Sequence, residues 1–353
     1  MNTLCLLLHN PGRAAGFSGR GWDDILVQAR QARLLGRLAA HLDQVPGLEV
    51  PSAVADVLRG AGIMIAHLHR RARFELRGLE AIARSADYPV VLLKGAAYLA
   101  ADLPAASGRS LSDIDVLVPK KALARFESAL HAAGWKFDET LTSYDEHYYR
   151  NWSHELPPLR HPERQYELDV HHTLVQPTSR MRLDTAALFE AIVPIAGTPF
   201  FRLGDEDLVL HSAAHLFMTD ELRGGLRDVV DMALLCRVFA ARDDDFWCAL
   251  ARRGRALGLQ RPLFYALDAM RHLIAVPVPE DALSLAAVGR PGPLRTALMR
   301  RLIAAHLAPA HPGAATARLS ERLLYLRSHW IRMPPLLLAR HLLTKAFLRR
   351  SVA

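Results

Sequence analysis

Residues 111–119 read Leu-Ser-Asp-Ile-Asp-Val-Leu-Val-Pro, and this short segment constrains the fold more than any other part of the chain. Apolar side chains at alternate positions give the period of a β-strand, which Pro119 ends. Asp113 and Asp115 therefore share the opposite face of the strand, with Cα atoms about 6–7 Å apart. Neighbouring carboxylates repel each other, so a buried pair of this kind indicates a site for a hard divalent cation such as Mg²⁺.

A second predicted strand carries a third acid. Residues 166–171, Tyr-Glu-Leu-Asp-Val-His, alternate in the same way and place Glu167, Asp169 and His171 on one side. With Asp169, three carboxylates from two strands make a platform for two Mg²⁺ ions, the arrangement used for in-line phosphoryl transfer. His171 is a candidate substrate contact or base on the same face, and a strand histidine without a catalytic role is the alternative.

A short apolar run precedes both of these strands. Residues 90–93, Val-Val-Leu-Leu, are typical of a strand covered on both faces. The run ends at Lys94-Gly95 before a helix-like segment, which places Lys94 and the backbone N–H groups near Gly95 to contact phosphate. For Lys94, the structural alternative is an exposed charge at a strand end.

The apolar periodicity divides the chain into three parts. Residues 1–85 repeat apolar positions at helical spacing, and residues 204–353 do so again. Between them, residues 86–203 read as a small mixed α/β core. We therefore predict an α+β fold in which a small mixed sheet is flanked by N-terminal and C-terminal helical regions.

Three local features complete this reading. The long helix that begins near Ser52 is expected to break near Gly60 and Gly62. Residues 135–137 begin a further short strand. Residues 140–165 are polar and aromatic without clear periodicity, so they are expected to form a long loop or irregular hairpin.

The charge balance argues against a nucleic-acid-binding protein. Lys and Arg number 44 and Asp and Glu 36, a net charge of +8, but eight basic residues and a single acid lie within 318–353. Because nucleic-acid recognition needs basic residues gathered over one face, no specific nucleic-acid partner is expected. The basic, amphipathic segment 318–353 favours packing as terminal helices, with weak contact to an anionic membrane surface or docking to a partner as the alternative.

Cysteine content and hydropathy bear on the compartment. The three cysteines show neither metal-ligand nor disulfide spacing, which is typical of a reducing cytoplasm. No stretch approaches the roughly 18 apolar residues that a membrane-spanning helix needs. We therefore expect a cytoplasmic protein.

Taken together, three motifs resemble the polymerase-β-like nucleotidyltransferase superfamily, and within it an uncharacterised bacterial nucleotidyltransferase family whose hallmark is an LLKG…R…SDIDLLV stretch. The matching motifs are Leu92-Leu93-Lys94-Gly95-Ala96-Ala97, Arg109-Ser110-Leu111-Ser112-Asp113-Ile114-Asp115-Val116-Leu117-Val118-Pro119 and Leu168-Asp169-Val170-His171. The resemblance covers nearly the whole chain.

The resemblance implies a reaction and a set of residues. The reaction is transfer of a nucleoside monophosphate from ATP or another nucleoside triphosphate to a hydroxyl of a small-molecule, peptide or protein acceptor. Mg²⁺ would be the cofactor, with Mn²⁺ as the alternative. By position, the resemblance makes Asp113 and Asp115 the metal-binding pair, Asp169 the third acid and Gly95 the phosphate-loop glycine. The nucleotide or phosphate contacts would be Lys94, Gly95, Arg109, Ser110 and Ser112.

Two departures from the family pattern keep other functions open. Ala96 stands where the superfamily generally has serine or glycine, and the sixteen residues between Ala96 and Asp113 form a longer loop than in many relatives. A catalytically silent scaffold that binds nucleotide or metal is therefore one alternative. A protein that docks to a membrane or partner through 318–353 is the other.

A histidine pair at residues 211 and 215 has the i, i+4 spacing of one helix face. This spacing is compatible with zinc chelation, but no HExxH motif accompanies it. We instead expect His211 and His215 to be interior histidines that face the catalytic cleft, where they are candidate substrate contacts together with His171.

Overall fold

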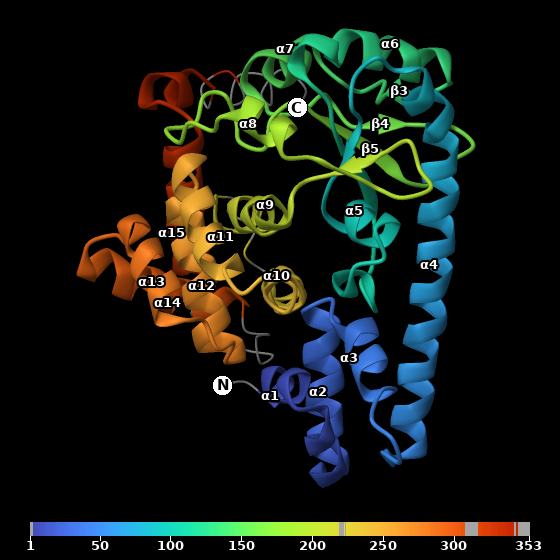
Figure 1. Cartoon of the computed structure of the whole chain (residues 1–353), viewed down its shortest axis with the longest axis vertical. Coiled ribbons are helices and arrows are strands. Elements are labelled where there is room, and N and C mark those ends of the chain that lie inside the picture. The colour runs from blue at the N-terminus through green and yellow to red at the C-terminus, as the bar shows by residue number, and fades with distance from the viewer. Residues whose placement is uncertain (1–2, 219–221, 223, 308–316, 342–343, 345–353) are drawn as a thin grey trace.

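A single mixed β-sheet organises the chain. The computed structural model describes residues 3–218, 222, 224–307, 317–341 and 344. Seven strands lie in the order β3-β4-β5-β2-β1-β7-β6, and they gather at the end of the molecule opposite α1–α3 (Figure 1). The strands are β1 (Val91–Leu92), β2 (Asp113–Leu117), β3 (Lys136–Phe137), β4 (Leu159–Arg160), β5 (Glu167–His171), β6 (Val193–Pro194) and β7 (Phe201–Arg202).

The sheet combines parallel and antiparallel pairs. β2 pairs in parallel with β5, and β1 pairs in parallel with β7, whereas the other neighbours are antiparallel. The predicted α+β fold with a small mixed sheet is confirmed. The sheet is wider than the sequence indicated because β4, β6 and β7 have only two residues each, too few to show an alternation.

Helices form the N-terminal part. They are α1 (Thr3–His9), η1 (Pro11–Gly16), α2 (Gly19–Gln31), α3 (Leu35–Leu42) and α4 (Ser52–Ser85). The break predicted near Gly60 and Gly62 is wrong, because α4 is one continuous helix of 34 residues. Each glycine costs a helix about 1 kcal/mol, and α4 offsets that cost by packing Leu76, Leu79 and Ala83 into the core. α4 runs along one side of the molecule from the level of α3 to the sheet (Figure 1).

Short helices connect the strands of the core. They are α5 (Lys94–Ala100), η2 (Pro104–Ala106), η3 (Lys120–Ala122), α6 (Leu123–Ala132), α7 (Ser143–Trp152) and α8 (Thr185–Glu190). The loop predicted for 140–165 is wrong over α7. Thr142 caps this helix by accepting a hydrogen bond from the Asp145 N–H, and Asp145 and Glu146 place negative charge in its first turn.

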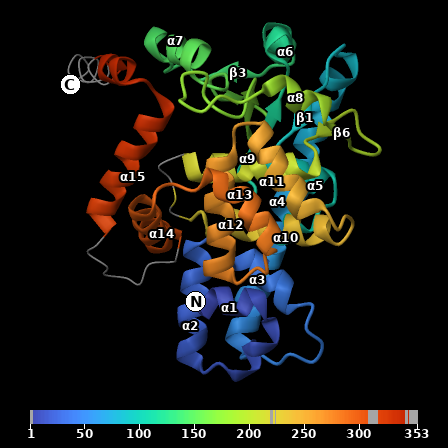
Figure 2. The ribbon, with the colours of Figure 1, turned by 60° about the vertical axis from the view of Figure 1, so that its left-hand side comes forward.

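The C-terminal part is helical, as predicted. It comprises α9 (Asp205–Met218), α10 (Leu226–Ala240), α11 (Phe246–Ala256), α12 (Gln260–Ile274), α13 (Glu280–Ala286), η4 (Ala287–Gly289), α14 (Pro293–Leu307) and α15 (Ala317–Arg332). α15 runs along the outer edge of the molecule toward α7 (Figure 2). Among the described helices, none is both long and apolar enough to cross a membrane.

One hydrophobic core joins all of these parts. It includes Trp22 of α2, Ile114 of β2 and Phe239 of α10, each 1% exposed or less. The division into 1–85, 86–203 and 204–353 stays a prediction about domain boundaries. Of the basic segment 318–353, residues 342–343 and 345–353 lie outside the described residues.

Candidate active site

The three acids predicted from the sequence lie together on one face of the sheet. β2 and β5 run parallel, and their register pairs Asp115 with Asp169 and Asp113 with Glu167. Paired residues of adjacent strands point to the same face, so the two strands present these carboxylates side by side. Asp115 is 3% exposed, and Asp113 and Asp169 are half-buried.

Two basic side chains contact Asp115. Lys94 Nζ donates a hydrogen bond to Asp115 Oδ1 at 2.9 Å, and His171 Nε2 lies 3.1 Å from the same oxygen. Lys94 begins α5 with a φ of +43°, a left-handed conformation that residues other than glycine seldom adopt. The ammonium of Lys94 therefore stands beside Asp115 in this structure, and an ion bound by Asp115 would have to share or replace that contact.

The charges at this site shift pKa values in opposite directions. Burial, followed by the charges of Asp115 and Glu155, raises the pKa of Asp169 to about 7. Burial and the charge of Asp115 raise the pKa of Asp113. Burial acts in the same direction on Asp115, but its two basic partners outweigh burial and hold its pKa well below the ordinary value. Two of the three acids are therefore short of compensating positive charge.

Two further residues at this site were not predicted from the sequence. Glu155 forms an isolated antiparallel bridge with His171, and the His154 carbonyl accepts a hydrogen bond from the His172 N–H at 2.9 Å. As a result, Glu155 Oε2 lies 3.5 Å from His171 Nε2 and 3.6 Å from His154 Nε2. His154 and Glu155 lie in a segment without periodicity, and only its long-range pairing with the end of β5 brings them to the acids.

A cavity of about 460 Å³ adjoins His154 and Glu155, and His215 of α9 is exposed to it. His211, one helical turn earlier, is buried, and the two rings are 6.5 Å apart. The charge of Lys94 lowers the pKa of His215 well below its ordinary value, and burial followed by the charge of Lys94 does the same for His211. Both rings are therefore neutral at neutral pH. Their contact with substrate stays a prediction.

The Arg109 guanidinium is engaged by helix α10. Its Nε donates to Asp231 Oδ2 at 2.7 Å, and its Cζ lies 5.7 Å from the ring centre of Tyr98. Asp231 also accepts a hydrogen bond from Arg37 of α3 at 2.7 Å. A structural role for Arg109, by pairing with Asp102 or by capping the loop, is the alternative to phosphate contact; the structure shows a structural pairing with Asp231 instead of Asp102. Contact of Arg109 with phosphate stays a prediction.

Gly95 is packed tightly against its surroundings. A Cβ at this position would collide with the Arg109 guanidinium and lie 3.2 Å from Leu111 Cδ2. Glycine is therefore required by packing, whether or not phosphate binds here. Of the two serines, Ser112 hydrogen-bonds to Asp113, and the Ser110 carbonyl accepts a hydrogen bond from Arg109 at 3.4 Å. The nucleotide contacts of these residues stay predictions.

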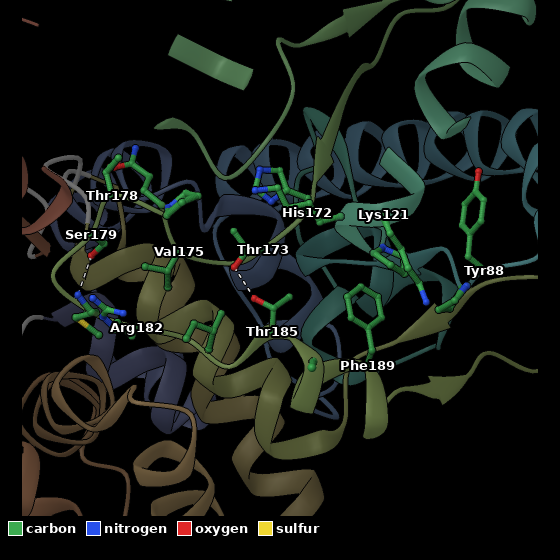
Figure 3. Close-up of a pocket in the computed structure, with 18 of the residues that line it drawn as sticks. Tyr88, Lys121, His172, Thr173, Val175, Thr178, Ser179, Arg182, Thr185 and Phe189 are labelled. Atoms are coloured by element: carbon green, nitrogen blue, oxygen red, sulfur yellow. Dashed lines mark hydrogen bonds between the residues drawn. The ribbon is translucent and has the colours of Figure 1, made fainter. Parts of the chain in front are cut away.

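A larger cavity of about 1130 Å³ lies next to the smaller one, and the two share Val175, Gln176 and Ser179 as a common wall. Figure 3 shows Tyr88, Lys121 and Phe189 toward one end and Thr178, Ser179 and Arg182 toward the other. Among the described residues of the lining, Asp87 is the one carboxylate, and it pairs with Arg125 at 2.8 Å. The lining also contains four cationic side chains, Lys120, Lys121, Arg180 and Arg182.

One comparison with known proteins identifies the class to which this chain belongs. A family model described as an uncharacterised nucleotidyltransferase matches residues 18–275. The chain therefore belongs to this nucleotidyltransferase family. No curated protein and no solved structure matches the chain significantly. Membership of the family supports nucleotidyl transfer as the general activity.

Proposed function

We propose that the protein is an Mg²⁺-dependent enzyme that transfers a nucleoside monophosphate from a nucleoside triphosphate to a hydroxyl of an acceptor. The observation that carries the proposal is the parallel register of β2 and β5. It places Asp113, Asp115 and Asp169 on one face, where burial and mutual repulsion raise the pKa of two of them.

The donor set fits the proposed ion. Carboxylate oxygens are the ligands that Mg²⁺ prefers, and Mn²⁺ accepts them as well. The raised pKa values of Asp113 and Asp169 fit a site that is completed by added positive charge. When bound, Mg²⁺ would neutralise the triphosphate and hold it in line with the attacking oxygen.

The protein's own groups perform the remaining tasks. Asp169, whose carboxylate lies beside the metal-binding pair on the same face of the sheet, is suited to accept the proton of the acceptor hydroxyl. Lys94, which reaches Asp115 from the start of α5, is suited to transfer its contact from the carboxylate to a phosphate oxygen. Pyrophosphate is the product that leaves.

The larger cavity is our proposed location for the acceptor. It shares a wall with the cavity at His154 and Glu155, and its lining contains four cations and one already paired carboxylate. At about 1130 Å³ it is large enough for a ligand of several hundred daltons. These features favour an acceptor that carries negative charge.

Release of pyrophosphate tests this proposal. We expect the full-length protein, given Mg²⁺, a nucleoside triphosphate and a set of phosphorylated hydroxyl compounds, to release pyrophosphate with at least one of them. Asp113→Asn and Asp115→Asn should lower the rate by about 10³-fold or more, since in-line transfer depends on electrostatic stabilisation. Asp102→Asn, at an exposed aspartate outside the site, is the control. Equal rates in all four proteins would contradict the assignment.

One observation favours the silent alternative. The ion pair between Lys94 and Asp115 already supplies one positive charge where an ion is proposed. A silent scaffold would bind nucleotide but release no pyrophosphate with any acceptor. The proposed enzyme binds nucleotide and releases pyrophosphate. Nucleotide binding measured beside pyrophosphate release separates the two.

A further inference from the structure

His154, Glu155 and His171 form a second set of donors beside the three acids. Their ligand atoms all lie within 4.8 Å of one another. Glu155 Oε2 is 3.6 Å from His154 Nε2 and 3.5 Å from His171 Nε2. The ligand atoms of a tetrahedral Zn²⁺ ion, bound at 2.0–2.1 Å, lie about 3.3 Å apart. The two separations from Glu155 Oε2 are therefore close to those of a tetrahedral site, and the two imidazole ligand atoms lie within 4.8 Å of each other.

From this geometry we propose that His154, Glu155 and His171 bind one borderline transition-metal ion of the Zn²⁺ class. Two imidazoles and one carboxylate are a donor set that suits Zn²⁺ and related ions, whereas Mg²⁺ takes oxygen ligands. This site is distinct in chemistry from the proposed Mg²⁺ site and does not depend on nucleotidyl transfer.

The backbone holds these donors in place. Glu155 and His171 are bridge partners, and the His154 carbonyl is bonded to the His172 N–H. His171 is 2% exposed, and its Nδ1 atom and that of His154 have no hydrogen-bond partner among the described residues. The Nε2 atoms of both rings lie near Glu155 Oε2, at 3.6 Å for His154 and 3.5 Å for His171.

The surroundings offer a fourth ligand and an entry path. Asp115 Oδ1 lies 3.1 Å from His171 Nε2, close enough to complete a tetrahedron or to adjoin one. The cavity of about 460 Å³ is lined by His154 and Glu155, so an ion and a water molecule have access from solvent. With Asp115 as a fourth protein ligand the site would be closed, whereas with water in that position it would have the three protein ligands and one open position typical of catalytic zinc.

Cobalt is the probe that tests the proposal without a variant. Full-length protein is stripped with a chelator and titrated with Co²⁺ alone, with no nucleotide present. We expect one equivalent to bind and to produce the intense visible absorption of a tetrahedral or five-coordinate Co²⁺ ion, and Zn²⁺ to displace it. Absence of stoichiometric binding, or the weak spectrum of an octahedral ion, would overturn the proposal.

Variants then assign the ligands. His154→Ala and Glu155→Gln should weaken Co²⁺ binding by more than about 100-fold, because loss of even an outer partner of a ligand costs 10–100-fold. His147→Ala, an exposed histidine on α7, and Asp113→Asn should leave it unchanged. Circular dichroism confirms that each variant is folded; His154→Gln replaces His154→Ala, and Glu155→Ala replaces Glu155→Gln, where the first variant is not. Equal Co²⁺ affinity in the wild type and both ligand variants would also overturn the proposal.

This design separates failure of the metal site from failure of the proposed function. If Asp113→Asn loses pyrophosphate release but keeps Co²⁺ binding, both proposals are supported. If Co²⁺ does not bind while pyrophosphate release is normal, the proposed Zn²⁺-class site is contradicted and the proposed function is not.

Discussion

At the residue scale, the proposed metal site depends on how positive and negative charges balance around Asp115. Lys94 and His171 contact one carboxylate oxygen, at 2.9 and 3.1 Å, whereas Asp113 and Asp169 have raised pKa values. The site therefore contains both an internal cation and carboxylates that lack one. Two predictions follow from this uneven balance.

Replacing Lys94 should separate ion binding from transfer. In Lys94→Met, we expect Mg²⁺ to bind about tenfold more tightly or better, because a cation that repels it is removed from Asp115. Nucleotidyl transfer should fall at the same time, because Lys94 no longer contacts phosphate. Calorimetric titration with Mg²⁺ and pyrophosphate release measure the two effects, with the exposed Lys136→Met as control. An unchanged Mg²⁺ affinity would show that Lys94 does not compete with the ion.

Asp169 should make the metal-free protein less stable as pH rises. Its pKa is 3.8 ordinarily and about 7 in the folded chain, so between these values the folded state binds more protons than the unfolded state. The free energy of unfolding therefore decreases as pH rises from about 4 to about 7. In chelator, Asp169→Asn should raise Tm relative to wild type by about 2–4 °C at pH near 8, and have little effect at pH near 4. A difference in Tm that is the same at both pH values would contradict this.

At the element scale, the sequence predicts the strands that carry the acids but not the elements that surround them. β2 and β5 alternate over five residues, enough to reveal their faces, and the apolar run at β1 is equally clear. β4, β6 and β7 have two residues each and form only because neighbouring strands supply their hydrogen bonds.

The other residues of the site could not be predicted from the sequence, because contacts with distant parts of the chain bring them into place. His154 and Glu155 join the acids through a bridge to β5, and Arg109 meets Asp231 across 122 positions of sequence. Contacts between residues so far apart have no local periodicity that could reveal them. α7 differs, since its Thr142 cap and first-turn acids were present in the sequence.

The buried network at Asp231 joins three elements and should be costly to break. Arg37 of α3 and Arg109, before β2, both bond to this carboxylate of α10, which is 1% exposed. Asp231→Ala leaves the buried Arg37 without its carboxylate partner and leaves Arg109 with Asp228 at 3.7 Å, so we expect a loss of about 3–5 kcal/mol in the free energy of unfolding. Asp56→Ala, at an exposed pair with Arg59, should cost less than about 1 kcal/mol. Urea denaturation measures both, and similar losses would contradict the structural role of the network.

At the scale of the whole molecule, the C-terminal helix reaches back to the region of the site. The carbonyl groups of Ile331 and Arg332 accept hydrogen bonds from residues 178–180, which line the larger cavity. Figure 2 shows α15 extending from α14 toward α7. Apolar side chains such as Leu319 and Leu326 remain exposed on it. Contact of 318–353 with a membrane stays a prediction, which sedimentation with anionic vesicles tests.

Arg327 should couple α15 to the cavity wall. Its guanidinium donates to the Phe217 carbonyl at 2.8 Å and lies 5.5 Å from the ring centre of Tyr265. In Arg327→Ala, we expect amide hydrogen exchange to become about tenfold faster, both in α15 and in residues 178–182, because the docking contact is lost. The exposed Arg322→Ala is the control. Faster exchange in α15 alone would show that residues 178–182 of the cavity wall are not stabilised by the docking of α15.

The most direct test of the central claim is calorimetric titration of a non-hydrolysable nucleoside triphosphate analogue, with and without Mg²⁺. We expect the wild type to bind the analogue much more tightly with Mg²⁺, and Asp113→Asn and Asp115→Asn to lose this dependence while Asp102→Asn keeps it. If the wild type and both site variants bind the analogue with the same dependence on Mg²⁺, the three acids do not form the catalytic metal site.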